Sequence, residues 1–242
     1  MHYYNEVDPL LCKWLENLIE DDWLPKGVVD CRPIEEVSPQ DVKGFDQCHF
    51  FAGVGGWPLA VRWAGYEKTK GLWTGSCPCQ PFSTAGKGLG LADDRHVWPH
   101  FYRLIKELKP TVCFGEQVGK KGGYEWFDHV SSDLEESDYA VGSANLCAAS
   151  EGAPHIRQRL FWVAYSEWHK QPWKEPRSWP SGRMGRKQQP LPWDRPWQSA
   201  LSELRVLDDG LPRRVAATDA ARNALVPQVA KTFIEGFFEA VG

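Results

Sequence analysis

The feature of this sequence that most constrains its fold is a glycine loop, Phe51-Ala52-Gly53-Val54-Gly55-Gly56. The loop follows a short apolar stretch and opens onto a helical pattern, as when a strand leads into the helix of a nucleotide-binding unit. In such units an Asp or Glu about 20 residues later usually holds the ribose of the cofactor. Here Ser76 occupies that place, so the ribose carboxylate must come from elsewhere in the chain.

Strand and helix patterns alternate along the chain. Strands are expected over 3–7, 27–30, 47–51, 72–76, 111–116, 139–149 and 158–165. Helices are expected over 10–19, 57–64, 97–108, 124–134 and from near 223 to 237. This alternation predicts an α/β fold with a doubly wound, mostly parallel sheet, whose ligands bind at the carboxyl ends of the strands.

Composition restricts the class of protein. The chain has 242 residues, of which 42% are hydrophobic and 25% charged, enough for one core and a small second lobe. No run of 18 apolar residues and no signal-peptide pattern is present, which predicts a cytoplasmic protein without a membrane partner. Seven cysteines without paired CxxC spacing predict reduced thiols and no metal site, and we expect a monomer.

Charge is unevenly distributed along the chain. The net charge is −4, but residues 164–200 carry seven Lys/Arg against three Asp/Glu, a balance of +4, which leaves −8 for the remainder. The same stretch holds five of the 13 tryptophans and six of the 18 prolines. One interpretation is a basic, aromatic insert that binds nucleic acid. The alternative is a solvated loop with its tryptophans packed against the core.

A cysteine lies at the end of the fourth predicted strand, in the loop Gly75-Ser76-Cys77-Pro78-Cys79-Gln80-Pro81-Phe82-Ser83. The loop resembles the nucleophile loop of DNA cytosine-5 methyltransferases, and Cys79 rather than Cys77 matches the nucleophile. Further segments match that family in order: Gly115-Glu116-Gln117-Val118, Pro154-His155-Ile156-Arg157-Gln158-Arg159 and Arg222-Asn223-Ala224-Leu225-Val226-Pro227. The glycine loop resembles the family's methionine-binding loop.

The resemblance implies a Rossmann-like methyltransferase that uses S-adenosylmethionine. A thiolate at C6 of cytosine makes C5 able to accept a methyl group, and the base must first leave the duplex. The residues expected to act in catalysis are Cys79, Glu116, Arg159 and Arg157. The residues expected to bind the cofactor are Phe51, Gly53, Gly55, Gly56, Glu6, Asp30, Pro78 and Asn223.

Glu6 and Asp30 imply that the motifs stand in a rearranged order. The family usually places the ribose strand and the adenine strand after the glycine loop, but both are missing between Gly65 and Cys77. Tyr4-Asn5-Glu6-Val7-Asp8 and the strand ending at Asp30 resemble those two elements, placed ahead of the loop. Glu6 is therefore the expected ribose ligand and Asp8 the expected helix N-cap. The alternative ribose ligand, Glu67, stands only 11 residues after Gly56, which leaves no room for a helix and a strand between them.

The resemblance also divides the chain. Residues 1–163 are expected to form the catalytic domain, 164–205 a small target-recognition insert, and 206–242 a segment returning to the catalytic domain. The expected partner is double-stranded DNA, as in restriction–modification. The residues expected to contact DNA are Ser83, Arg177, Arg183, Arg186, Lys187 and Arg195.

Three departures and three alternatives accompany this interpretation. Gln117 replaces the family's Asn. Val7 stands where the family often has a larger side chain beside adenine, and Arg222 replaces a glycine. An RNA cytosine-5 methyltransferase, or a catalytically silent DNA-binding relative, would share most of the pattern. A dinucleotide oxidoreductase is disfavoured because Pro58 stands at the third glycine of its fingerprint.

Overall fold

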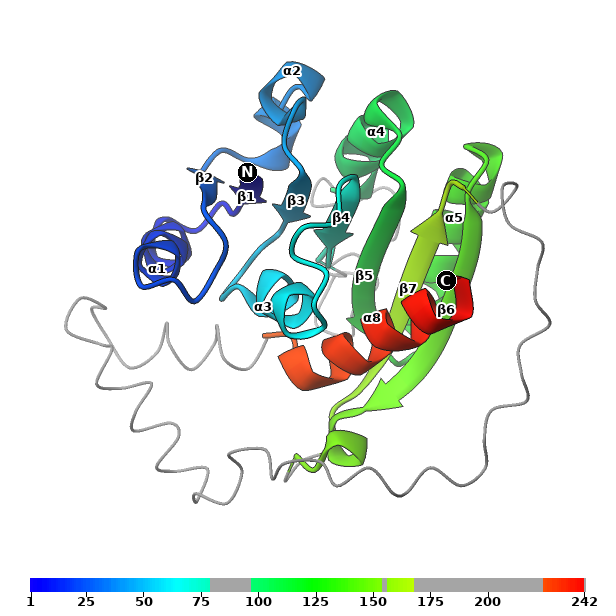
Figure 1. Ribbon diagram of the computed structural model, residues 1–242. Helices are drawn as coiled ribbons and strands as arrows, with labels where there is room; N and C mark the ends of the chain where they lie inside the picture. The colour runs from blue at the N-terminus through cyan, green and yellow to red at the C-terminus, as the bar shows by residue number, and fades with distance from the viewer. Residues whose placement is uncertain (79–96, 154–155, 168–223, 242) are drawn as a thin grey trace.

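One mixed sheet of seven strands organises the computed structural model, which describes residues 1–78, 97–153, 156–167 and 224–241. The strands are β1 (His2–Asn5), β2 (Gly27–Asp30), β3 (Gln47–Phe50), β4 (Leu72–Gly75), β5 (Val112–Val118), β6 (Ala140–Cys147) and β7 (Gln158–Tyr165). Their order in the sheet is β2-β1-β3-β4-β5-β7-β6 (Figure 1). The first five strands in this order are parallel, and β7 is antiparallel to both of its neighbours. The predicted α/β fold with a mostly parallel sheet is confirmed.

Helices cover both faces of this sheet (Figure 1). One face carries α1 (Pro9–Glu20), α3 (Gly56–Trp63) and α8 (Pro227–Val241). The other carries η1 (Ile34–Glu36), α2 (Pro39–Val42), α4 (Trp98–Leu108) and α5 (Lys121–Glu136). A short turn, η4 (Ala148–Glu151), connects β6 toward β7.

The central strands are buried on both faces, as their sequences require. Every residue of β1, β3 and β4 is buried, because helices cover the sheet on both faces. Among the buried polar side chains, Asn5 and Gln47 donate to main-chain carbonyls, and three others contact one another. The ring of His49 lies 2.9 Å from the Thr74 hydroxyl and 3.4 Å from the ring of His2, so three neighbouring strands share a buried polar chain.

Local sequence explains where α1 begins. The Asp8 side chain accepts a hydrogen bond from the Leu10 N–H at 2.8 Å, and Pro9 occupies the first helical position. Asp8 is thus the N-cap, as predicted, because its carboxylate satisfies an amide that has no partner within the helix.

The structure corrects several sequence expectations. The first strand ends at Asn5 rather than continuing to Val7, and the last helix begins at Pro227 rather than near Asn223. The short helix α2 was not predicted, because four residues are too few for a periodic pattern. The prediction of reduced thiols is wrong for Cys12 and Cys31, which form a disulfide with a Cα–Cα distance of 6.1 Å. Spacing could not reveal this pair, since only the fold brings α1 beside the end of β2.

Among the described residues, no helix combines the length and the apolar composition that crossing a bilayer would require.

Candidate active site

Glu6 reaches the glycine loop directly, although 47 residues separate it from Gly53. Strand β1 pairs with β3 in parallel, with Asn5 beside Phe50, so Glu6 and the glycine loop leave the same edge of the sheet side by side. One carboxylate oxygen of Glu6 accepts the Gly53 N–H at 2.8 Å. The other oxygen accepts the N–H groups of Val7 and Asp8 at 2.9 and 3.0 Å. The rival Glu67 lies just ahead of β4, where it pairs with Arg62.

The glycine loop has the shape that a close-lying cofactor needs. Gly53 and Gly55 have φ values of +54° and +86°, in the region that favours glycine. Among the described residues, a Cβ at Gly53 would meet only the Phe51 carbonyl, at 3.9 Å. The described part of the chain therefore leaves room beside this glycine and the Glu6 carboxylate.

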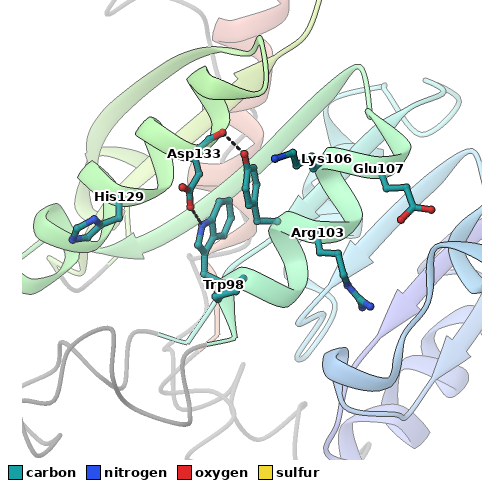
Figure 2. Close-up of a pocket in the computed structure, with 8 residues that line it drawn as sticks. Trp98, Arg103, Lys106, Glu107, His129 and Asp133 are labelled. Atoms are coloured by element: carbon teal, nitrogen blue, oxygen red, sulfur yellow. Dashed lines mark hydrogen bonds between the residues drawn. The ribbon is translucent and has the colours of Figure 1, made fainter.

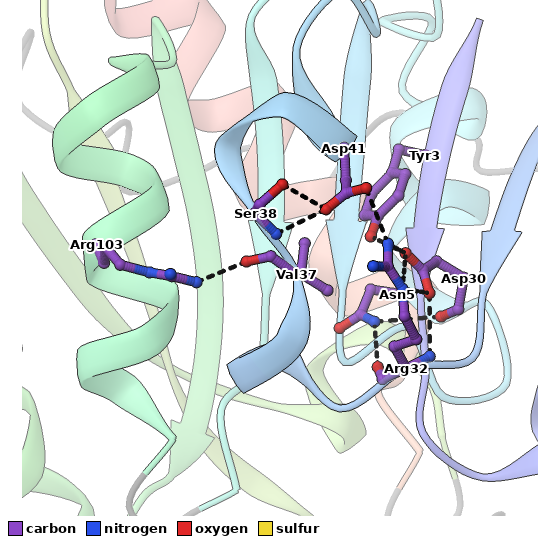
Figure 3. Close-up of polar contacts among 8 residues, drawn as sticks. All are labelled: Tyr3, Asn5, Asp30, Arg32, Val37, Ser38, Asp41 and Arg103. Carbon is purple, nitrogen blue, oxygen red and sulfur yellow. Dashed lines mark hydrogen bonds and ion pairs between the residues drawn. The ribbon is translucent and has the colours of Figure 1, made fainter.

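Asp30, by contrast, is fully engaged by protein groups (Figure 3). Its carboxylate accepts from the Tyr3 hydroxyl at 2.7 Å and from the Arg32 guanidinium at 2.6–3.2 Å. Arg32 also pairs with Asp41 of α2 at 3.1 Å. Burial opposes ionisation of Asp30, but the bonds from Arg32 and Tyr3 outweigh it and lower its pKa. Sequence reasoning missed Arg32, whose only signal is its position two residues after Asp30.

Glu116 and Arg159 form the best-defined charged pair at this edge of the sheet. The Arg159 Nε lies 2.7 Å from a Glu116 carboxylate oxygen, and both side chains are largely buried. Residue 159 pairs with Val118, two positions from Glu116, so the antiparallel register places both side chains on one face. Burial raises the pKa of Glu116, and the nearby Arg159 and Arg157 offset this only in part.

Arg157 holds the chain segment that leads into α8. Its Nη2 donates to the Ala224 carbonyl oxygen at 2.6 Å. The next residue, Leu225, lies over the glycine loop, because a Cβ at Gly56 would stand 3.0 Å from the Leu225 Cβ. Arg157 therefore holds the segment that packs on the glycine loop. Asn223 lies outside the described residues.

The entrance to the nucleophile loop is tied to its neighbours. The Trp57 indole of α3 donates to the Ser76 hydroxyl at 2.8 Å, and the buried Gln117 amide donates to the Cys77 carbonyl at 3.2 Å. Cys77 is buried in the core, and this burial raises the pKa of its thiol, which disfavours the reactive thiolate. The exposed Pro78 is the last described residue before Cys79. Outside the described residues lie Cys79, Ser83, Arg177, Arg183, Arg186, Lys187 and Arg195.

Two hollows lie away from this edge. A half-open groove of about 500 Å³ runs between α4 and α5 and is lined by Trp98, Arg103, Lys106 and His129 (Figure 2). Its floor is held by the Trp98 indole, which donates to Asp133 at 2.7 Å. The other hollow, of about 610 Å³, lies around Met1 and Lys70. Within the described part of the chain, no three His, Cys, Asp or Glu side chains are grouped as metal ligands would be.

Comparison with known sequences decides the family. The sequence model of C-5 cytosine-specific DNA methylases matches residues 61–209. The chain belongs to this family. The match starts after the glycine loop, so Glu6, which follows β1, and Asp30, which ends β2, lie outside it.

Among curated members of the C-5 cytosine-specific family, the chain is similar to Type II methyltransferases. It is 33% identical to M.NgoMIV of Neisseria gonorrhoeae over 138 residues, which cover 53% of this chain and 43% of that protein. It is 30% identical to M.HhaI of Haemophilus parahaemolyticus over 92 residues, covering 36% and 28%. The chain thus spans less than half the length of these relatives.

A solved structure of similar shape is that of the Entamoeba histolytica methyltransferase EhMeth. It has a TM-score of 0.49 and 17% sequence identity, and the alignment covers 72% of this chain and 46% of that chain.

Proposed function

We propose that this protein is a DNA cytosine-5 methyltransferase that uses S-adenosylmethionine. The observation that carries the proposal is the juxtaposition of three features at one edge of the sheet. These are the Glu6–Gly53 contact, the buried Glu116–Arg159 pair, and the Cys77–Pro78 segment that leads to Cys79. Strands β3, β4 and β5 are consecutive neighbours, which supports placing these features in one site.

The cofactor would be held mainly by the glycine loop and the strand beside it. Glu6 would accept hydrogen bonds from the ribose hydroxyls, since carboxylates are strong acceptors. Gly53, Gly55 and Gly56 would lie against the methionine part, with Phe51, Pro78 and Asn223 around them and Asp30 toward the adenine. S-adenosylmethionine, when bound, would supply an electrophilic methyl group.

The chemistry of the protein's own groups follows from their types. The Cys79 thiolate would form a bond with C6 of cytosine, and the displaced electron pair would make C5 nucleophilic. Glu116, in its protonated form, would donate to N3 and offset the negative charge that develops there. Arg159 would orient Glu116 and donate to O2. After C5 is methylated, a base would take the C5 proton, and the electron pair of that bond would re-form the C5–C6 double bond and release the Cys79 thiolate.

The target cytosine would have to leave the duplex, because C6 is inaccessible within stacked base pairs. We propose that residues 164–205 form the recognition insert and that 206–242 return the chain to the catalytic domain. Because the insert is basic within an acidic chain, Arg183 and Arg186 are expected to contact phosphates. Their joint change to alanine should weaken DNA binding and reduce the slope against log salt by about 1.8, with cofactor binding unchanged.

Incubation with labelled S-adenosylmethionine and duplex DNA, followed by nucleoside analysis, tests the function. Label in 5-methylcytosine of DNA is the expected result. Label in RNA alone would favour the alternative of an RNA cytosine-5 methyltransferase. DNA binding without label in either nucleic acid would favour the silent relative and would overturn the proposal.

A further inference from the structure

Helix α1 contacts three of the segments that carry the predicted cofactor residues. It begins three residues after Glu6, with Asp8 as its N-cap. Its Leu15 and Leu18 lie under the glycine loop, since a Cβ at Gly55 would stand 3.4 Å from each of them. Cys12 links the helix to Cys31, the residue after Asp30. Helix α1 (Figure 1) therefore links Glu6, the glycine loop and the end of β2.

Trp14 makes a polar contact between α1 and the glycine loop. Its indole Nε1 donates to the Val54 carbonyl oxygen at 3.2 Å, across 40 residues of sequence. Trp14 is only half-buried and belongs to none of the three hydrophobic clusters, so filling the core does not explain its position. Its hydrogen bond is the more specific feature.

The bonded carbonyl lies between two glycines of the loop. Val54 stands between Gly53 and Gly55, and glycine restricts backbone rotation less than any other residue. The Gly53 N–H bonds to Glu6 at 2.8 Å, and the Gly55 N–H, which belongs to the same peptide group as the Val54 carbonyl, bonds to the Ala52 carbonyl at 2.9 Å. The Trp14 bond therefore adds a second restraint to this peptide group, on its carbonyl side.

We infer that Trp14 is a positioning residue for the cofactor site. Its indole N–H holds the Val54 peptide so that the glycine loop keeps its cofactor-binding shape before the cofactor arrives. The inference rests on the proposed function, since it assigns Trp14 to the S-adenosylmethionine site. Pre-organisation of this kind increases affinity because less conformational freedom is lost on binding.

The test compares Trp14→Phe with Trp98→Phe. Both changes keep an aromatic ring and remove one indole N–H donor, but Trp98 donates to Asp133 on the opposite face of the sheet. Calorimetry with S-adenosylmethionine should show roughly threefold to tenfold weaker binding for Trp14→Phe, the loss expected for one hydrogen bond. In the methylation assay, KM for the cofactor should rise by a similar factor while kcat stays unchanged.

Amide hydrogen exchange of the cofactor-free protein provides a second measurement. Residues 52–56 should exchange faster in Trp14→Phe than in the wild type, and at the wild-type rate in Trp98→Phe. Unchanged exchange in Trp14→Phe, or an equal loss of affinity in Trp98→Phe, would overturn the inference. Failure of the wild type to bind S-adenosylmethionine would instead overturn the proposed function, and the exchange data would still decide whether Trp14 positions the loop.

Discussion

In the half of the sheet that we propose to bind the cofactor, the cofactor half (β2, β1 and β3), Glu6 accepts three main-chain N–H groups. In the half that we propose to carry the chemistry, the catalytic half (β4, β5 and β7), Glu116 is held by the side chain of Arg159. The first arrangement needs only two parallel strand ends side by side, whichever comes first in the chain. The second needs an antiparallel register that sets two particular side chains on one face. Connectivity can therefore be rearranged more freely in the cofactor half than in the catalytic half.

The largest expected effect concerns Cys79 in the catalytic half. Replacing Cys79 by Ser should reduce methyl transfer on the order of 10³-fold or more, because the covalent nucleophile is lost. DNA containing 5-fluorocytosine should trap the wild type as a stable adduct, and Cys79→Ser should form none. The control is Cys77→Ser, since Cys77 is buried and its raised pKa disfavours a thiolate. Loss of the adduct in that control, with the protein still folded, would assign the nucleophile to Cys77.

Glu116→Gln should reduce methyl transfer by about 10²-fold or more, because a general acid is lost while the shape is kept. Burial raises the pKa of Glu116, so its protonated form persists to higher pH than that of an ordinary glutamic acid. Wild-type kcat should then fall as pH rises through this raised pKa, and the fall should be absent in Glu116→Gln. The matched control is Glu125→Gln, an exposed acid on α5. An identical pH profile for wild type and Glu116→Gln would contradict the assignment.

Glu6→Ala tests the cofactor half directly. It should weaken S-adenosylmethionine binding by about 1–3 kcal/mol, the cost of leaving hydrogen-bonding groups without a partner. Calorimetry measures this, with Glu67→Ala as the control, because Glu67 pairs with Arg62 ahead of β4. If Glu67→Ala weakened S-adenosylmethionine binding more than Glu6→Ala, Glu6 would not be the ribose ligand, and the comparison between the two halves would fail.

The smallest expected effect is on stability and arises from the buried histidines of the cofactor half. Burial lowers the pKa of His49 well below its ordinary value, and the neighbouring His2 lowers it further. The folded state therefore keeps His49 neutral, so its contribution is complete above the unfolded pKa near 6.5 and is lost as pH falls below it. Urea unfolding between pH 7.5 and pH 5.5 should show stability falling by up to about 1.4 kcal/mol per pH unit for this residue.

His49→Gln should remove most of this dependence while keeping a polar partner for Thr74. The unfolding m-value serves as the control, since a constant m-value shows that the exposed surface is unchanged. A slope as steep in His49→Gln as in the wild type would assign the pH dependence to other groups.

Much of the fold could be predicted from the sequence because its signals are local. The strand patterns, the N-cap Asp8 and the glycine loop each depend on a few adjacent residues. The predicted neighbourhood of Glu6 and Gly53 came from the family resemblance, which matches Tyr4-Asn5-Glu6-Val7-Asp8 to the ribose strand, and the structure brings the two residues into contact. What sequence left open was the short helix α2, which has too few residues to show a period.

The sequence by itself determined which residue types stand at the strand ends, and through them the family resemblance. Only the tertiary structure decided how those residues are paired. In the structure, Asp30 accepts hydrogen bonds from Arg32 and Tyr3, and Cys12 forms a disulfide with Cys31. Arg157 donates to the Ala224 carbonyl, and Trp14 donates to the Val54 carbonyl. The last three pairs join segments far apart in the chain, and the Asp30 cluster also draws Tyr3 in from another strand. Local propensity does not specify such contacts, because they depend on which strands and helices pack together.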